Sequence, residues 1–315
     1  MALGSQMEQE VREQPAVLAD NAGRYFHTLS EALGGKQFDL VLLAARGSSD
    51  NAALFARYLI EIHLGIPVSL AAPSVITRHG SQIRYPERTF AIGVSQSGAA
   101  PDVSEVLAYM RRQGHTTLAI TNTAGSRLAS EAEFSLELGV GTEGSIAATK
   151  TYTASLLALA QTVRALGASL PAPTLPDDAW IDRCEEAAAT DSGLLVRSSP
   201  VFCLARGYDF ATAQETSLKL MECALVPAKS FSTADFAHGP RALAGHGTAA
   251  VVYGETPDGL AETGTAIITA PAAGQGVYDP IWHVVFGQWL ALTAARARGL
   301  DPDRAQNLQK VTQTL

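Results

Sequence analysis

The sequence contains little cysteine and no long apolar run. Three cysteines occur in 315 residues, an odd number without the spacing of a metal or redox motif, so we expect no disulfide framework and a cytoplasmic protein. The N-terminal segment has no apolar core of the kind found in secretion signals. No stretch of about 18 apolar residues is present to span a bilayer. These absences predict no leader peptide and no membrane partner.

A surplus of basic residues is also missing. The chain has 23 Lys and Arg against 31 Asp and Glu, a formal net charge of -8, and no Lys/Arg cluster stands out along it. Proteins that bind nucleic acids or anionic lipid surfaces use such clusters to neutralise phosphates in series. The sequence therefore predicts no nucleic-acid partner. Any phosphate that the protein recognises is expected on a small molecule.

What is present is an alternation of short apolar runs with helix-length segments. The apolar runs in the first half are DLVLLAARG, IPVSLA, RTFAIGVSQSG and TTLAIT. Strands that are apolar throughout and are separated by helices form parallel sheets that are covered on both faces. The pattern predicts an α/β fold with a doubly wound, flavodoxin-like parallel sheet.

The same order of motifs occurs twice along the chain. AARG at 44–47 returns as LARG at 204–207, and GAAPD at 98–102 returns as GETPD at 254–258. Both matches recur in the same order and at nearly the same separation. This repetition indicates a duplicated module.

A proline-rich segment at 168–180 separates the two copies. Such a composition is typical of a linker, and a helix is expected to begin near Asp177. We therefore predict two tandem modules. Residues 1–172 comprise an N-terminal helical arm and the first module, and residues 173–315 comprise the second module and a C-terminal tail.

The second copy has a short connection between two of its strands. Only GLAETG separates GETPD from the next strand-like run, TAIITA at 265–270. A parallel crossover normally needs about 10–12 residues including its helix. Either this unit has lost its helix, or residues are missing from the sequence.

Hydroxyl and amide side chains follow two of the predicted strands. In an open parallel sheet, ligands bind outside the carboxyl ends of the strands, and both segments lead into helices whose first-turn N–H groups attract anions. Serine is also a favoured helix N-cap, so capping alone is an alternative for either cluster. Two clusters on neighbouring strands favour a phosphate site. Its candidate residues are Gly47, Ser48, Ser49, Ser95, Gln96 and Ser97.

A third loop supports this interpretation. GVGTEGSIAATKT at 139–151 is rich in small residues and precedes a long apolar helix pattern. Its glycines would let backbone N–H groups approach a ligand closely. Alone it is a weak signal, because most glycine-rich loops are turns.

Three charged residues lie on one face of a predicted helix in the second module. Glu215, Lys219 and Glu222 are spaced i, i+4 and i+7, so they share a face over two turns. A solvent-exposed ladder of salt bridges is one interpretation. The apolar residues around the trio leave little of the helix for solvent, which favours a functional group of residues.

His238 follows this helix in the segment DFAHGP. The Gly-Pro pair after it makes a rigid turn that can fix the direction of the imidazole. A lone histidine is more often structural than catalytic, so the motif alone leaves both interpretations open.

Six motifs, taken together, resemble a known family. They are ARGSSD, VSQSG, GTEGSIAATKTYT, ETSLKLMECAL, DFAHGP and DPDRAQNLQKVTQTL, and they cover nearly the whole chain. They resemble the double sugar-isomerase (SIS) domain proteins, above all the isomerase half of glucosamine-6-phosphate synthase (glutamine:fructose-6-phosphate amidotransferase). Glucosamine-6-phosphate deaminases and fructosamine deglycases are relatives of the same kind. The resemblance implies two tandem SIS modules that bind a sugar phosphate.

The resemblance also implies which residues contact the substrate. The phosphate would be held after the first and third strands, and the backbone of the small-residue loop would lie near the sugar. Ala99 and Ala100 depart from the family, which usually has a charged residue and a hydroxyl there. The implied ligand contacts are Ser49, Ser95, Gln96, Ser97, Ile146 and Ala147.

Catalytic roles follow from the resemblance in the same way. Glu222 would move the proton between C1 and C2, and Lys219 would contact the open-chain sugar. His238 would assist ring opening, often from the partner subunit, which implies a homodimer. Lys310 in the C-terminal tail would reach back to the sugar carbonyl. A solvated lysine in a frayed tail is the alternative that the sequence by itself favours.

The residue types fit an aldose–ketose interconversion at a 2-amino sugar, which needs a carboxylate base, a cation or donor, and an acid for the ring oxygen. No cofactor or metal is required, and no cluster with metal-ligand spacing occurs. The chain begins near the isomerase half and has no N-terminal cysteine, so glutamine-dependent synthesis is not expected unless a separate subunit supplies ammonia. The expected reaction converts glucosamine 6-phosphate and water to fructose 6-phosphate and ammonia.

Three alternatives remain open at this point. A deglycase that cleaves a fructosamine 6-phosphate adduct, such as fructoselysine 6-phosphate, needs the same proton transfers with a different leaving amine. An ammonia-dependent aminosugar-phosphate synthase would run the reaction in reverse. A non-catalytic sugar-phosphate sensor is disfavoured because it has no use for a proton-transfer carboxylate such as Glu222.

Overall fold

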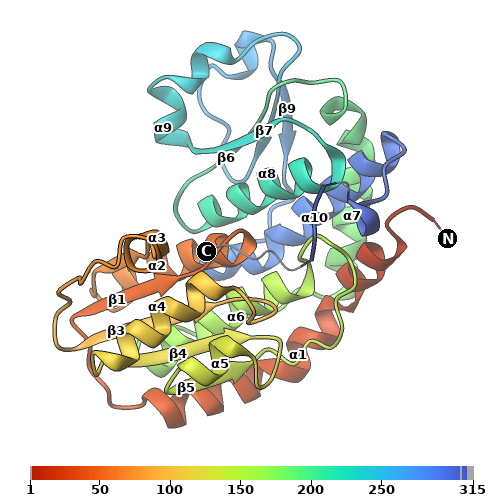
Figure 1. Cartoon of the computed structure of the whole chain (residues 1–315). Coiled ribbons are helices and arrows are strands. Elements are labelled where there is room, and N and C mark those ends of the chain that lie inside the picture. Colours follow the sequence, from red (N-terminus) through yellow and green to blue (C-terminus); the bar gives the residue numbers. More distant parts are fainter. Residues whose placement is uncertain (1, 306, 311–315) are drawn as a thin grey trace. The chain divides into compact units, whose positions relative to one another are not determined.

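Two parallel β-sheets organise the chain, as the alternating pattern predicted (Figure 1). The structure is a computed structural model that describes residues 2–305 and 307–310. One sheet has five strands and the other has four. No helix in the described part of the chain is both long enough and apolar enough to cross a bilayer.

The chain forms two compact units, and neither is one continuous stretch. The five-stranded unit comprises Ala16–Thr142 and Thr151–Pro173, and the four-stranded unit comprises the chain up to Pro15, Glu143–Lys150 and Thr174–Lys310. In the predicted division at 172/173, the segment up to Pro15 and the 143–150 loop belong to the first module. By packing, both group with the four-stranded sheet.

The five-stranded sheet has the order β2-β1-β3-β4-β5, which is the flavodoxin-like doubly wound order. Every neighbouring pair of strands is parallel. The strands are β1 (Leu40–Ala44), β2 (Val68–Leu70), β3 (Thr89–Val94), β4 (Thr116–Thr121) and β5 (Phe134–Glu137). The helices before and between them are α1 (Ser5–Leu33), α2 (Ser48–His63), α3 (Pro73–Thr77), α4 (Pro101–Arg112) and α5 (Arg127–Glu131), and α6 (Lys150–Ala165) follows β5.

Helices on the sheet explain why its strands are apolar throughout. All six residues of β3 are buried, as expected for a central parallel strand that is covered on both faces. On one face, Val103 and Leu107 of α4 and Leu128 of α5 form a buried cluster with alanines of β3 and β4. Figure 1 shows α4 and α5 beside these strands.

The four-stranded sheet repeats the start of this topology with the order β7-β6-β8-β9. Its strands are β6 (Val201–Ala205), β7 (Ala228–Ser232), β8 (Ala249–Val252) and β9 (Ala266–Thr269). The α-helices are α7 (Asp178–Leu195), α8 (Phe210–Ala224), α9 (Thr233–Ala237) and α10 (Asp279–Ala297). The 3₁₀ turns are η1 (Gly207–Asp209), η2 (Pro240–Leu243), η3 (Ala261–Thr263), η4 (Gly276–Tyr278) and η5 (Pro302–Arg304). Asp177 caps α7 by accepting a hydrogen bond from the Trp180 amide, so the predicted helix start near Asp177 is confirmed.

The connection between β8 and β9 contains no α-helix. Residues 253–265 form the link, and their only helical element is the 3₁₀ turn η3. β9 nevertheless pairs with β8 in parallel, with Ala249 opposite Ala266. The predicted strand TAIITA is therefore confirmed, and the link before it consists of turns and bends.

Helix α8 packs closely against α10 in the core of the four-stranded unit. Gly287 of α10 makes this approach possible, because a Cβ atom there would lie 2.3 Å from Thr216 Oγ1 and 3.0 Å from Tyr253 Oη. Those two oxygens are themselves hydrogen-bonded at 2.6 Å. The position of α8 therefore depends on the missing side chain at Gly287.

We predict that Gly287→Ala lowers the stability of the protein by about 1–3 kcal/mol, because the added methyl group overpacks the α8–α10 contact. Gly23→Ala is the matched control, since Gly23 lies inside α1 and a Cβ there meets nothing within 4 Å. Alanine in a helix interior is favoured over glycine, so the control is expected to be neutral or stabilising. Chemical denaturation of both variants measures this, and equal stability would contradict the close contact.

Candidate active site

Two members of the charged trio of α8, Glu215 and Lys219, are buried, and Glu222 is partly exposed. Glu215 and Lys219 are each 1% exposed, whereas the side chain of Glu222 is 24% exposed. The Lys219 ammonium lies 3.4 Å from a Glu215 carboxylate oxygen and donates a hydrogen bond to Glu222. The interpretation as a solvated surface ladder is therefore wrong, because these side chains are inside the protein.

Burial and the two carboxylates act in opposite directions on Lys219. Desolvation disfavours the ammonium form, but the charges of Glu215 and Glu222 outweigh it, so the pKa of Lys219 is raised above its ordinary value. The lysine therefore stays a cation at neutral pH. It can balance a carboxylate or a developing negative charge, but it cannot act as a base.

Helix α8 ends immediately after this trio. Leu225 adopts a left-handed conformation with φ of 52°, a region that a branched side chain rarely occupies. Its carbonyl oxygen accepts a hydrogen bond of 2.9 Å from Arg298. This stop places Glu222 in the last turn of the helix.

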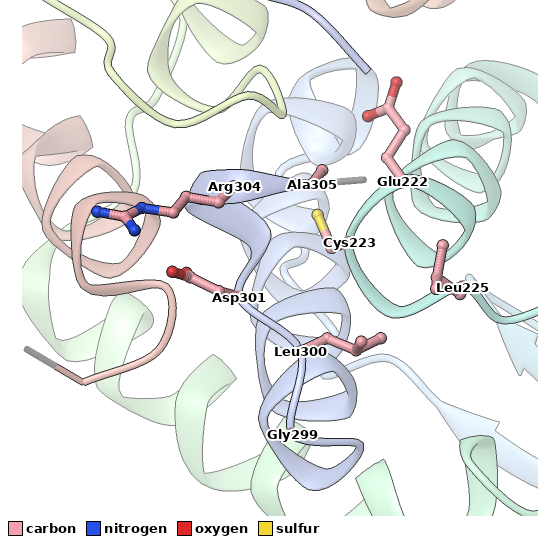
Figure 2. A pocket seen from close by; sticks show the side chains of 8 residues that line it. All are labelled: Glu222, Cys223, Leu225, Gly299, Leu300, Asp301, Arg304 and Ala305. Carbon is pink, nitrogen blue, oxygen red and sulfur yellow. The ribbon is translucent and has the colours of Figure 1, made fainter. Parts of the chain in front are cut away.

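A small cleft of about 150 Å³ opens at that end of α8. Figure 2 shows Glu222 and Cys223 on α8, opposite Asp301, Arg304 and Ala305. Burial raises the pKa of the Cys223 thiol to about 12, so this thiol stays protonated. Among the titratable groups on α8 at the cleft, Glu222 is the one suited to proton transfer.

The tail lysine is docked within the same unit. Lys310 Nζ donates to a carboxylate oxygen of Glu143 at 2.8 Å and to the Ser145 carbonyl oxygen at 2.6 Å. The Glu143 side chain is fully buried, and that of Lys310 is 23% exposed. The frayed-tail interpretation is therefore wrong for Lys310 as far as the chain is described.

Two buried glutamates hold the loop that receives Lys310. Glu10 of α1 accepts hydrogen bonds from the amides of Gly144 and Ser145 and from the Thr149 hydroxyl at 2.8 Å. Glu143 accepts from the amide and hydroxyl of Thr149. Burial raises the pKa of Glu10, and these hydrogen bonds only partly oppose it. The 143–150 loop, which includes Ile146 and Ala147, is thus fixed by its own Glu143 and by Glu10 of a distant segment.

The segment that precedes the tail is anchored to the start of α1. Asp301 accepts a hydrogen bond from the Gly4 amide, and Asp303 accepts bonds of 2.8 and 2.9 Å from the amides of Gln6 and Met7. Gln6 and Met7 belong to the first turn of α1 and Gly4 directly precedes it. Unsatisfied N–H groups and the helix dipole favour a carboxylate at this position. Two aspartates therefore fix the chain nine and seven residues before Lys310.

The predicted phosphate residues gather at one edge of the five-stranded sheet. β1 and β3 are neighbours, with Ala44 opposite Gly93, so the segments that follow them start side by side. Each segment contains a left-handed glycine, Gly47 with φ of 56° and Gly98 with φ of 61°. At Gly98 a Cβ atom would lie 2.1 Å from the Ser126 hydroxyl, so only glycine fits.

The hydroxyl groups at this edge do not cap the helices. The N-cap of α2 is Gly47 and that of α4 is Ala100, and neither helix has a side-chain cap. Within the described chain, the hydroxyls of Ser48 and Ser49 form no hydrogen bond with protein atoms, and Ser97 accepts only one, from the Ala99 amide. Simple capping, the alternative to a phosphate site, is therefore not what these serines do.

His238 lies apart from these interactions. It is the exposed C-cap residue of α9, and its ring makes no hydrogen bond with the described part of its own chain. An exposed, unengaged imidazole is compatible with contribution to another subunit. That role stays a prediction.

The structure thus brings the predicted residues together in three groups. One is the α8 trio, the second is Lys310 on the loop of Ile146 and Ala147, and the third is the serine edge of the five-stranded sheet. Sequence reasoning missed Glu10, Glu143 and Asp303. The Asp-x-Asp pattern in DPDR is the one available signal, because paired aspartates are typical partners of backbone N–H groups.

Comparisons with known proteins agree with this fold. Residues 39–165 match the SIS domain family. Two solved structures share the fold over nearly the whole chain. The glucosamine-6-phosphate deaminase of Thermotoga maritima has a TM-score of 0.80 at 22% identity, with 98% of this chain and 100% of that chain covered. The C-terminal domain of the glucosamine-fructose-6-phosphate aminotransferase of Francisella tularensis has a TM-score of 0.77 at 21% identity, with 94% and 97% covered. The chain therefore contains a SIS domain at residues 39–165.

Within this class, the chain is similar to one group of curated relatives. It is 32% identical to the glutamine–fructose-6-phosphate aminotransferase (isomerizing) of Symbiobacterium thermophilum, over 96% of this chain and 58% of that protein. The corresponding protein of Methanothermobacter thermautotrophicus is 28% identical, over 96% and 56%. The chain therefore spans little more than half the length of these relatives.

We predict that Lys219→Met lowers the stability by about 3–5 kcal/mol, because it removes the cation between two carboxylates in the interior. The matched control is Lys229→Met at an exposed position of β7, where a change within about 0.5 kcal/mol is expected. Thermal and denaturant unfolding measure both variants. Equal effects of the two substitutions would show that the charge balance of α8 contributes little.

Proposed function

We propose that this protein is a phosphosugar isomerase of the SIS type that deaminates glucosamine 6-phosphate to fructose 6-phosphate and ammonia. The observation that carries the proposal is the charged trio of α8, in which Glu222 reaches a cleft while Lys219 and Glu215 stay inside. A carboxylate backed by a permanent cation is suited to moving a proton between adjacent carbons. Similarity to the Thermotoga maritima deaminase and to the aminotransferases supports the choice of substrate class.

The serine edge is assigned to the phosphate group. Hydroxyls of Ser48, Ser49 and Ser97, together with the first-turn amides of α2 and α4, donate hydrogen bonds without adding a net charge. Left-handed glycines at Gly47 and Gly98 let the backbone come close to the ligand. Neutral donors suit a phosphate monoester that must be bound and then released. Ser95 and Gln96 are assigned to the same group.

Proton transfer is assigned to Glu222. After ring opening, the carboxylate removes the proton from C2 of the open-chain amino sugar and returns it to C1. The aldehyde oxygen gains a proton and the amine nitrogen loses one, so the aldehyde becomes a hydroxymethyl group and C2 becomes an imine carbon. Water adds to the imine and ammonia leaves, which gives the ketone of fructose 6-phosphate. One water is consumed for each ammonia that is released. Proton transfer by a positioned group contributes about 10²–10⁴-fold to the rate.

The remaining residues support this step. Lys219, a cation because its pKa is raised, donates a hydrogen bond to Glu222, and Glu215 lies on its other side at 3.4 Å. A direct contact of Lys219 with the sugar stays a prediction. Lys310, held by Glu143, is assigned to the sugar carbonyl, with the Ile146 and Ala147 backbone beside the sugar. His238 is assigned to ring opening.

We predict that Glu222→Gln reduces turnover by about 10²–10⁴-fold while sugar-phosphate binding is retained, because the amide fills the same space but cannot accept a proton. Ammonia and fructose 6-phosphate released from glucosamine 6-phosphate are measured together. Glu186→Gln, at an exposed position of α7, is the matched control and should keep full activity.

The outcomes of this assay separate the candidate reactions. Equal amounts of ammonia and fructose 6-phosphate support the deaminase. No release from glucosamine 6-phosphate, with release of the amine from fructoselysine 6-phosphate, would replace it by a deglycase. Formation of glucosamine 6-phosphate from fructose 6-phosphate and ammonia alone would identify a synthase. Binding that is unchanged in Glu222→Gln, with no turnover of any substrate by the parent protein, would indicate a sensor.

We predict that His238 acts in the site of a partner subunit. His238→Asn and Glu222→Gln should each abolish activity, but a mixture refolded together should regain about a quarter of the parent activity, because half of randomly formed dimers are mixed and each holds one intact site. Light scattering reports the dimer. A mixture as inactive as its two inactive components would place His238 and Glu222 in the same subunit's site. An active His238→Asn variant would remove the histidine from catalysis.

A further inference from the structure

A second cleft, of about 390 Å³, lies within the four-stranded unit. Its walls follow the carboxyl ends of three strands, with Arg206 after β6, Thr233 after β7, and Tyr253, Glu255 and Asp258 after β8. Ligand pockets of proteins typically enclose about 300–1,000 Å³. The cleft is therefore large enough for a small molecule, and none of the residues assigned to the proposed reaction lines it.

The topology of the sheet places this cleft where ligands bind in open α/β folds. The strand order β7-β6-β8-β9 reverses between β6 and β8, and crevices form outside the carboxyl ends of strands at such a switch point. In the five-stranded sheet the equivalent point lies between β1 and β3, where the proposed phosphate residues are. Left-handed glycines occur at both edges of the second cleft too, Gly207 with φ of 66° and Gly254 with φ of 91°.

The short β8–β9 connection leaves the cleft open. In the five-stranded unit, helix α4 begins at Pro101, soon after β3 ends. After β8 the described chain has only the turn η3 before β9. Glu255 and Asp258 are therefore exposed at the rim, and the Asp258 carbonyl is held at 2.6 Å by Arg241.

The charges in the cleft are of both signs. The Asp209 carboxylate is engaged by His283 at 2.9 Å and by the Thr212 hydroxyl. Burial alone would lower the pKa of His283, but the contact with Asp209 raises it. The positive charge of His283 therefore offsets most of the negative charge of Asp209. Within the described chain, the Arg206 guanidinium and the carboxylates of Glu255 and Asp258 have no hydrogen bond or ion pair with protein groups.

An unpaired guanidinium and two unpaired carboxylates call for a ligand with complementary groups. A guanidinium binds phosphate or carboxylate in a forked geometry, and carboxylates accept hydrogen bonds from ammonium and hydroxyl groups. We propose that this cleft binds a small zwitterion, a molecule that has one phosphate or carboxylate group and an ammonium group. The anion lies on Arg206, and the ammonium lies against Glu255 and Asp258.

The cleft is separate from the proposed catalytic carboxylate. It lies at the N-terminal end of α8, whereas Glu222 lies in the last turn of that helix. Thirteen residues of helix from Asp209 to Glu222 correspond to about 20 Å. Occupancy of this cleft can therefore be measured without turnover, and the two proposals can fail independently.

Hydrogen–deuterium exchange with mass spectrometry tests the proposal. The probes are glucosamine 6-phosphate and L-lysine, which have a phosphate and a carboxylate respectively, and glucosamine, which lacks an anion. Zwitterion binding should slow exchange in peptides that cover 203–212 and 250–262, and whichever zwitterion gives protection identifies the anion. Arg206→Gln should raise the ligand concentration needed for the same protection at least tenfold, since a charge-assisted contact is removed.

Matched variants make the result specific. Arg112→Gln changes an exposed arginine of α4 whose side chain makes no hydrogen bond or ion pair with the described chain, and it should leave the protection unchanged. Ser97→Ala and Glu222→Gln should also leave it unchanged, so its presence stands even if the proposed reaction fails. Glu255→Gln serves as a second variant if Arg206→Gln does not fold. No protection of these peptides by either zwitterion, or equal protection by glucosamine, would overturn the proposal.

Discussion

Balance of charge inside α8 is the constraint on which the candidate active site depends. An isolated ammonium at the position of Lys219 would be disfavoured by several kcal/mol, and Glu215 and Glu222 offset that cost from the same helix face. Because all three charges sit on one helix, their geometry is set by helical spacing. Sites built on a helix are held more rigidly than sites built on loops. Helix α8 ends at Leu225, which has a left-handed conformation. The absence of a side chain at Gly287 lets this helix pack closely against α10.

The two sheets use one topology for different chemistry. In both, the strand order reverses beside the first strand, and a left-handed glycine follows each of the two strands at the reversal. The five-stranded sheet places neutral hydroxyls there, whereas the four-stranded sheet places Arg206 and two carboxylates. The backbone geometry is retained while the side chains differ. Fold and ligand preference are thus separate properties of each module.

The sequence predicted the elements better than their surroundings. Runs that are apolar throughout, without alternation, identified the strands. Asp177 marked a helix start, because an N-cap is a local signal. The face shared by Glu215, Lys219 and Glu222 also followed from local spacing. Whether that face was solvated or buried did not, since burial depends on α10, which lies far along the chain. Local patterns therefore predict which residues share a helix face, but they do not predict whether that face is buried.

The contacts of Lys310 show the same limit. Its partners Glu143 and Ser145 are 167 and 165 residues away, and no local pattern connects such distant positions. Glu10 was not predicted either, because a glutamate in a long helix is usually solvated. The strand-end serines were found because topology alone brings the ends of neighbouring strands together.

The segments up to Pro15 and at Glu143–Lys150 precede the linker in sequence but pack with the four-stranded sheet. A single cut at the linker would therefore remove Glu10 and Glu143 from the body that contains α8. Because segments of the first half pack with the second half, the second half cannot be expressed alone without losing these contacts.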